Sequence, residues 1–222
     1  MQNIDYSQEK KANINRWVLG LWFFASILFI KCQYNAPVPY IHYSAHPIAD
    51  SIFQIALNKS DNSDPDSTIQ AISWIDKAIL IDSLNPEYYG VKAKLLSEMG
   101  MLDSALAVQE KALELGAING EFYFQLGLFQ FVKERHKEAK LNFKNCVIYQ
   151  DQLLQAHPDS LGGYFIRQAA HSLLHENDDL FMEDIKLVRE LFPDRLLEIQ
   201  FMRRFKPSQL LDQIKKAQEI GS

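Results

Sequence analysis

A histidine pair is the arrangement in this sequence that comes closest to a site for chemistry. His171 and His175 lie four positions apart, so in a helix both imidazoles would project from one face, as in a metal-binding pair. Glu176 is the sole nearby candidate for a third ligand, and the leucines between the histidines favour ordinary helix packing. We therefore expect no metal ion and no other cofactor.

An acidic stretch is the second candidate, because it resembles a calcium-binding loop. Asp61, Asp64 and Asp66 supply carboxylates at short spacing. A calcium loop, however, has a glycine at its sharp turn and a glutamate at its end. Here Pro65 interrupts the series, so a solvated linker is the better interpretation.

The common catalytic motifs are missing from the sequence. It contains no glycine-rich phosphate loop, no Gly-x-Ser-x-Gly elbow and no His-Glu-x-x-His helix. Two cysteines, Cys32 and Cys146, are too few for a disulfide framework or a multi-cysteine zinc site, and the expected helix-core position of Cys146 argues against a bond between them. The net charge of -5, with no basic stripe carrying aromatic residues, argues against nucleic-acid binding. We expect a protein without catalysis, with a metal-dependent enzyme as a remote alternative.

An apolar run near the N-terminus predicts where the protein is located. The segment RWVLGLWFFASILFIK, residues 16–31, encloses fourteen uncharged residues. A membrane-spanning helix needs about 20, so we expect an uncleaved anchor that extends over residues 16–34. A lipoprotein acylated at Cys32, a cleaved secretory signal and a buried helix are the alternatives. Basic residues before the run predict that residues 1–15 are cytoplasmic and the bulk of the chain is extracytoplasmic, while residues 35–47, with three prolines, predict an extended spacer.

The middle of the chain repeats itself with a fixed period. Two columns of small side chains recur at the same spacing: Ala71, Ala105 and Ala139 in one, and Ala78, Ala112 and Cys146 in the other. Antiparallel helices that approach closely need small side chains where their axes cross, and Gly127 is expected to oppose Ala139. Gly100 stands at a predicted turn, where a helix can end in a left-handed conformation.

Over residues 85–147 this pattern resembles the tetratricopeptide repeat family, whose period is about 34 residues. The resemblance implies an all-α fold: a right-handed α-solenoid of three to four helical hairpins over residues 48–192, capping helices over residues 193–222, and one hydrophobic helix before them. The last hairpin is offset by more than one period, because the helix after Val147 is expected to run on. The sequence departs from the family pattern at Lys92, Gln109, Ala117, Gln130 and Ile148.

The resemblance also implies a binding surface. In this family the first helices of successive repeats line a concave face, and the residues implied there are Glu87, Val91, Lys94, Phe124, Gln125, Leu128 and Phe131. The three apolar residues of the second group, Phe124, Leu128 and Phe131, share one helical stripe. This stripe could equally pack on a neighbouring helix. Of the carboxylate clamp that chaperone-binding members carry, Lys94 alone has a counterpart here.

These observations together predict a membrane-tethered interaction module that binds a peptide or a partner protein and has no catalytic activity. The alternative is an assembly factor that holds a complex near the bilayer. In that case anionic headgroups would be contacted by the basic C-terminal residues, which are Arg203, Arg204, Lys206, Lys215 and Lys216.

Overall fold

The computed structural model describes residues 46–60, 65–116, 119–202 and 204–221, and within these ranges every regular element is helical. The elements are α2 (Pro47–Ser60), α3 (Pro65–Ile81), α4 (Pro86–Glu98), α5 (Leu102–Glu114), α6 (Gly120–Val132), α7 (His136–Ala156), α8 (Leu161–His175), α9 (Asp178–Leu191), η1 (Pro193–Arg195), α10 (Leu196–Met202) and α11 (Pro207–Gly221). The expected cytoplasmic tail, the anchor over residues 16–34 and nearly all of the spacer lie outside the described residues.

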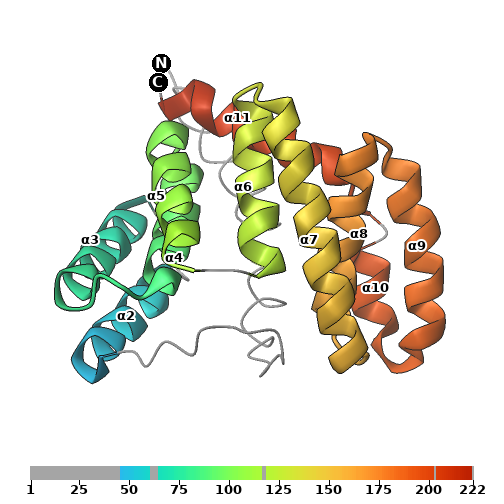
Figure 1. The fold of residues 1–222 in the computed structure, drawn as a ribbon, viewed down its shortest axis with the longest axis horizontal. Coiled ribbons are helices and arrows are strands. Elements are labelled where there is room, and N and C mark those ends of the chain that lie inside the picture. The colour runs from blue at the N-terminus through green and yellow to red at the C-terminus, as the bar shows by residue number, and fades with distance from the viewer. Residues whose placement is uncertain (1–45, 61–64, 117–118, 203, 222) are drawn as a thin grey trace, which may run out of the picture.

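Consecutive helices pack as hairpins, and the hairpins stand side by side (Figure 1). The pairs are α2 with α3, α4 with α5, α6 with α7, and α8 with α9, and the second helix of each pair also contacts the first helix of the next. This arrangement is that of a helical repeat, and it confirms the expected all-α fold for the described residues. Among their helices, none is both long and apolar enough to cross a membrane.

The same backbone turn closes each hairpin whose turn lies within the described residues. Gly100 (φ 77°), Glu134 (φ 59°) and Glu176 (φ 52°) each adopt a left-handed conformation after the first helix of a pair. In each case the next residue donates its N–H to a carbonyl near the end of that helix, as from Met101 to Leu96 at 2.9 Å. This bond satisfies a carbonyl that the helix end would otherwise leave unpaired. The turn predicted at Gly100 is confirmed, and glutamate occupies the equivalent position in the two later hairpins.

The small-residue columns of the sequence lie at the helix crossings. All six alanine and cysteine side chains are fully buried, which confirms their expected place in the core. Gly127 was expected to oppose Ala139, but it faces Phe143: a Cβ atom at position 127 would lie 2.6 Å from that ring. The glycine of α6 therefore makes room for an aromatic ring of α7 as well as for the close approach of the two helices. Cys146 is a free thiol, and burial raises its pKa.

Polar residues at three of the departures from the repeat pattern link helices to one another. Gln109 is fully buried in α5 and donates its side-chain amide to the carbonyl of Phe122 in α6, at 3.2 Å. The amide oxygen of Gln130 accepts a hydrogen bond from Asn142 at 2.7 Å, inside the α6–α7 hairpin. Lys92 of α4 pairs with Asp76 of α3 at 2.5 Å. These contacts hold one hairpin to the next, or one helix to its partner, where an apolar side chain would do so by packing.

The long helix α7 explains the change of period. It continues to Ala156, and its last turns pack on α8, with Arg167 and Asp151 joined by an ion pair at 2.5 Å. The next hairpin therefore begins later in the sequence, as the run-on pattern predicted, while its turn keeps the geometry of the earlier ones.

The C-terminal helices do not both close the end of the stack. η1 and α10 stay beside α9, whereas α11 turns back and crosses α8, α6 and α4, the first helices of three successive hairpins (Figure 1). The reason is its amphipathic pattern. Pro207, Leu210, Leu211 and Ile214 form a buried stripe, which requires an apolar surface to cover.

The crossing at Gly127 can be tested by substitution. We expect Gly127→Ala to lower the free energy of unfolding by about 1–3 kcal/mol, because the added methyl group overpacks against Phe143. Helix propensity alone predicts the opposite sign, since alanine stabilises a helix by about 1 kcal/mol relative to glycine. Urea unfolding followed by circular dichroism measures the difference.

A double-mutant cycle supplies the control for this prediction. Phe143→Leu frees space beside position 127, so Gly127→Ala should cost less in that background than in the wild-type chain. Equal costs in the two backgrounds would show that the ring of Phe143 is not what excludes a side chain from position 127.

Candidate functional site

The surface that the repeat resemblance assigns to a partner is formed by α4, α6 and α8, and we call it the first-helix face. All seven predicted contact residues lie on two of these helices: Glu87, Val91 and Lys94 on α4, and Phe124, Gln125, Leu128 and Phe131 on α6. Their exposure differs widely, so the face is not one continuous surface.

The α4 part of the face is open and charged. Glu87 is exposed, and Val91 and Lys94 are partly exposed. The ammonium group of Lys94 lies 3.9 Å from the carboxylate of Glu98, one turn along the helix. This row of side chains is accessible to a partner.

The α6 part is largely buried. The three apolar residues of its stripe, Phe124, Leu128 and Phe131, each pack against a different neighbour. Phe124 is 7% exposed and packs on Phe143 of α7 with ring centroids 6.1 Å apart, inside the hairpin core. The rings of Phe131 and His136 are nearly perpendicular, with centroids 4.6 Å apart. Gln125 is partly exposed, and Leu128 is 1% exposed. That a partner contacts Phe124 and Leu128 stays a prediction, and in this arrangement protein side chains already surround both.

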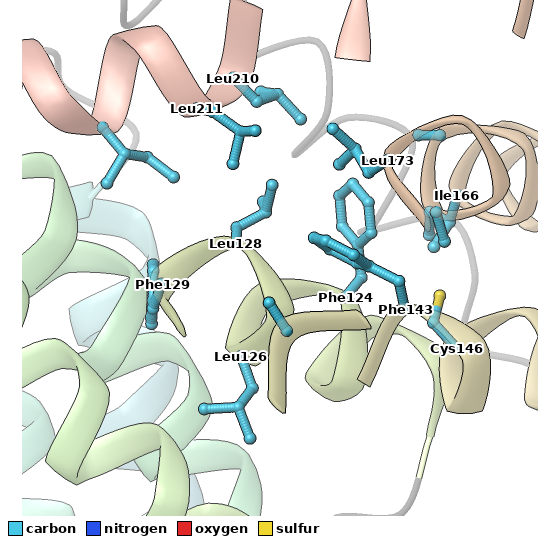
Figure 2. Close-up of a cluster of buried hydrophobic side chains, with 14 of the residues drawn as sticks. Phe124, Leu126, Leu128, Phe129, Phe143, Cys146, Ile166, Leu173, Leu210 and Leu211 are labelled. Carbon is cyan, nitrogen blue, oxygen red and sulfur yellow. The ribbon is translucent and has the colours of Figure 1, made fainter. Parts of the chain in front are cut away.

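Leu128 is covered by α11. Leu210 and Leu211 project from α11 toward Leu128 of α6, with Leu173 of α8 on the same side of the cluster (Figure 2). Leu128 and Leu173 stand in the C-terminal halves of their helices. The chain's own helix therefore occupies the C-terminal half of the first-helix face.

Two contacts fasten the start of α11. Both the backbone N–H and the hydroxyl of Ser208 donate to the carboxylate of Asp178 at the start of α9, at 3.1 and 2.5 Å. Just before α11, Phe205 packs against Phe165 and Phe181 with centroid separations of 5.1 and 5.7 Å. The helix is thus held to α8 and α9 at its N-terminal end.

The opposite half of the face carries acidic residues in a repeat column. Glu87 and Glu121 are one period apart and occupy the first turns of α4 and α6. Desolvation by the surrounding protein, and then the neighbouring charge of Glu87, raises the pKa of Glu121 to about 7. Desolvation and the charge of Asp50 in α2 raise the pKa of Glu87 as well. Carboxylates in a first turn are favoured by the helix dipole, but here they also crowd one another.

Sequence reasoning missed two parts of this surface. Glu121 was detectable, because it stands one period after Glu87, which had been assigned to the face. The cover supplied by α11 had a weaker signal: the spacing of Leu210, Leu211 and Ile214 predicts an apolar stripe but does not say which surface it meets.

The residues considered for chemistry pack as ordinary helix side chains. The rings of His171 and His175 lie edge to face with centroids 4.8 Å apart. Within the part of the chain that the structure describes, no group of three or more His, Cys, Asp and Glu side chains is arranged to hold a metal ion. Asp66 lies in the first turn of α3, and Asp61 and Asp64 are outside the described residues.

Comparison with known families identifies one repeat. The family model of the tetratricopeptide repeat matches residues 86–115, which form α4, α5 and the turn between them. No curated protein matches the sequence. The match supports a tetratricopeptide repeat protein, a class that generally consists of non-catalytic protein–protein interaction modules.

The raised pKa of Glu121 predicts a pH dependence of stability. In the unfolded chain its pKa returns to about 4.5, so between pH 4.5 and 7 the folded state binds more protons and becomes less stable as the pH rises. Between pH 5 and pH 8 the wild type should lose about 1–3 kcal/mol of unfolding free energy through this group. We expect the Glu121→Gln variant not to show this loss. Urea unfolding at the two pH values measures it.

Glu183→Gln is the matched control, because it removes an exposed glutamate from α9. If both variants follow the wild-type pH profile, Glu121 is not held in a charge-disfavouring environment.

Proposed function

We propose that this protein is a membrane-tethered, right-handed tetratricopeptide-like solenoid that binds a partner protein or peptide on its first-helix face. One observation carries the proposal: three hairpins close with the same left-handed turn and stand side by side, and one of them matches the tetratricopeptide repeat. Stacked repeats of this kind create extended surfaces for binding other proteins. No catalysis is part of the proposal.

The tether in this proposal is the apolar segment of residues 16–34, with the helical domain on the extracytoplasmic side. Its support is the uncharged run and the basic residues before it. Acylation at Cys32 is the alternative means of attachment. Either form of attachment would leave the helical hairpins free to meet a partner at the membrane surface.

The accessible half of the first-helix face favours a particular kind of partner. The carboxyls of Glu87 and Glu121 lie on it and become negatively charged as the pH rises through their raised pKa values. Val91, between Glu87 and Lys94 on α4, adds an apolar side chain. Like charges that already repel one another are relieved when a cation approaches. A segment carrying lysine or arginine next to apolar side chains therefore complements this surface.

The alternative role, contact of the basic C-terminal residues with headgroups, has weaker support. Arg204, Lys206, Lys215 and Lys216 are exposed, but Asp212 and Glu219 are exposed on the same helix as the last two. The mixed charge lowers the attraction to an anionic surface. Partner binding on the first-helix face is the function that the geometry supports better.

Site-specific photo-crosslinking tests the proposal. A benzophenone amino acid is placed at Val91 or Gln125 on the first-helix face, and at Leu80 or Leu141 as controls. These two leucines are 85% and 59% exposed on second helices. In native membranes we expect the two face positions to capture the same protein and the two controls to capture none of it, as judged by mass spectrometry.

The charge of the face gives an independent check on the same adduct. Glu87→Lys should reduce its yield several-fold, because it places a positive charge where a basic segment would dock. Capture from Leu80 and Leu141 as efficient as from Val91 and Gln125 would remove the first-helix face as the binding surface.

A further inference from the structure

The first-helix face changes character where α11 crosses it. Along the repeat columns, Lys94 and Glu98 of α4 correspond to Leu128 and Val132 of α6, one period later. The two residues of α6 are 1% and 7% exposed. A charged surface in one repeat is thus an apolar surface in the next, and the chain covers that apolar surface with an amphipathic helix. The sequence of α6 is accordingly mostly apolar, with Glu121, Gln125 and Gln130 as its polar residues, since other helices cover most of its surface.

An apolar stripe and a polar contact at its first turn hold α11 on this surface, which spans α4, α6, α8 and α9. One stripe of Leu210, Leu211 and Ile214 is buried, while Gln209, Asp212, Lys215, Lys216, Glu219 and Ile220 on its other sides are exposed. Ser208 in the first turn contacts Asp178 of α9, and Ser208 is itself exposed. Such a helix resembles a peptide laid into a groove through its anchors at i, i+1 and i+4.

Phe205 is the residue before α11 that is anchored in the aromatic core. Its ring is 6% exposed and belongs to the aromatic cluster with Phe165 and Phe181. Rotation about the backbone of Lys206, between Phe205 and Pro207, would let α11 leave the face without loss of that cluster. Departure of α11 would expose Leu128 and Leu173 to solvent, which is unfavourable unless another apolar surface replaces it.

We propose that α11 is a displaceable occupant of the first-helix face, and that a partner binds there through an amphipathic helix with the same Leu-Leu-x-x-Ile pattern. This rests on the proposed function, because it takes the partner surface to be that face. The partner helix covers Leu128 and Leu173 in place of α11. Binding is then a competition between an intramolecular and an intermolecular helix for one apolar surface, and the intramolecular helix sets the threshold for partner binding.

Hydrogen exchange on the wild-type full chain tests whether α11 opens independently of the rest. We expect the amides of α11 to exchange at least about 10-fold faster than those of α6 and α8, because a separate opening exposes α11 alone. Exchange of α11 at the same rate as α6 and α8 would mean that it leaves only on global unfolding, and the proposal would be overturned.

A peptide of the chain's own residues 205–221, labelled with a fluorophore, tests the recognition. The released variant, Leu211→Asp with Ile214→Asp, detaches α11, and the matched control, Gln209→Asp with Ile220→Asp, adds the same charge on the exposed side. By fluorescence anisotropy, we expect the peptide to bind the released variant at least about 10-fold more tightly than the wild type or the control, because α11 no longer competes for the face. A peptide carrying both aspartates should not bind.

If the released variant does not fold, Asp178→Asn with Ser208→Ala weakens the fastening without adding charge beneath the helix. This pair of substitutions should increase both the exchange rate of the α11 amides and the affinity for the peptide. A folded variant with a free face that still does not bind the peptide would overturn the proposal. So would a peptide-independent dimer in light scattering, since the occupant would then be the α11 of a second copy.

Crosslinking separates this inference from the proposed function. Released chains should capture several-fold more partner from Gln125 than wild-type chains do. If the wild type captures as much, the partner still binds the first-helix face, but α11 does not compete with it. If neither captures a partner while the peptide binds the released variant, the proposed function fails and α11 is shown to be displaceable.

Discussion

The close crossing of the two helices in each hairpin is the constraint on which the rest of this structure depends. At the α6–α7 crossing a hydrogen atom on Gly127 faces the ring of Phe143, where a methyl group would lie 2.6 Å away. Ala139, on the same helix as that ring, is fully buried. Small side chains here allow the backbones to approach, and that approach determines where the large side chains around them can go. The left-handed turn at Glu134 then returns the chain at the required angle.

Stacking such hairpins brings equivalent residues of successive repeats close together, with opposite consequences for apolar and for charged columns. In the core columns identical small residues meet the same requirement in each repeat. On the first-helix face, desolvation and then the charge of the equivalent residue Glu87 raise the pKa of Glu121 to about 7. With this pKa, Glu121 is only partly ionised near neutral pH. A carboxyl whose pKa is raised in the folded state lowers the free energy of unfolding as the pH rises.

The helix α11 gives the stack a second layer. By crossing α8, α6 and α4 it joins three hairpins that otherwise contact their sequence neighbours, so the apolar surface of α6 is covered on the side where a partner was expected. The same contacts explain two features together: why α6 has few polar residues and why α11 is amphipathic. The stability of the stack depends on this surface, since whatever covers it stabilises the hairpins beneath.

Local pattern by itself determined much of this protein. The periodic spacing of small residues predicted the hairpins, Gly100 predicted its turn, and the run after Val147 predicted a long helix and a later fourth hairpin, because helical period and turn chemistry act over short stretches of chain. Tertiary structure decided which neighbour covers each face. Phe124 and Phe131 share one helical stripe, yet one packs on Phe143 and the other on His136. Leu128 lies beneath α11, a helix six elements further along the chain, and the pKa of Glu121 depends on desolvation by its neighbours and then on a carboxylate one repeat earlier. A helical period shows which side chains point the same way; what they meet there depends on contacts between distant segments, which the period does not encode.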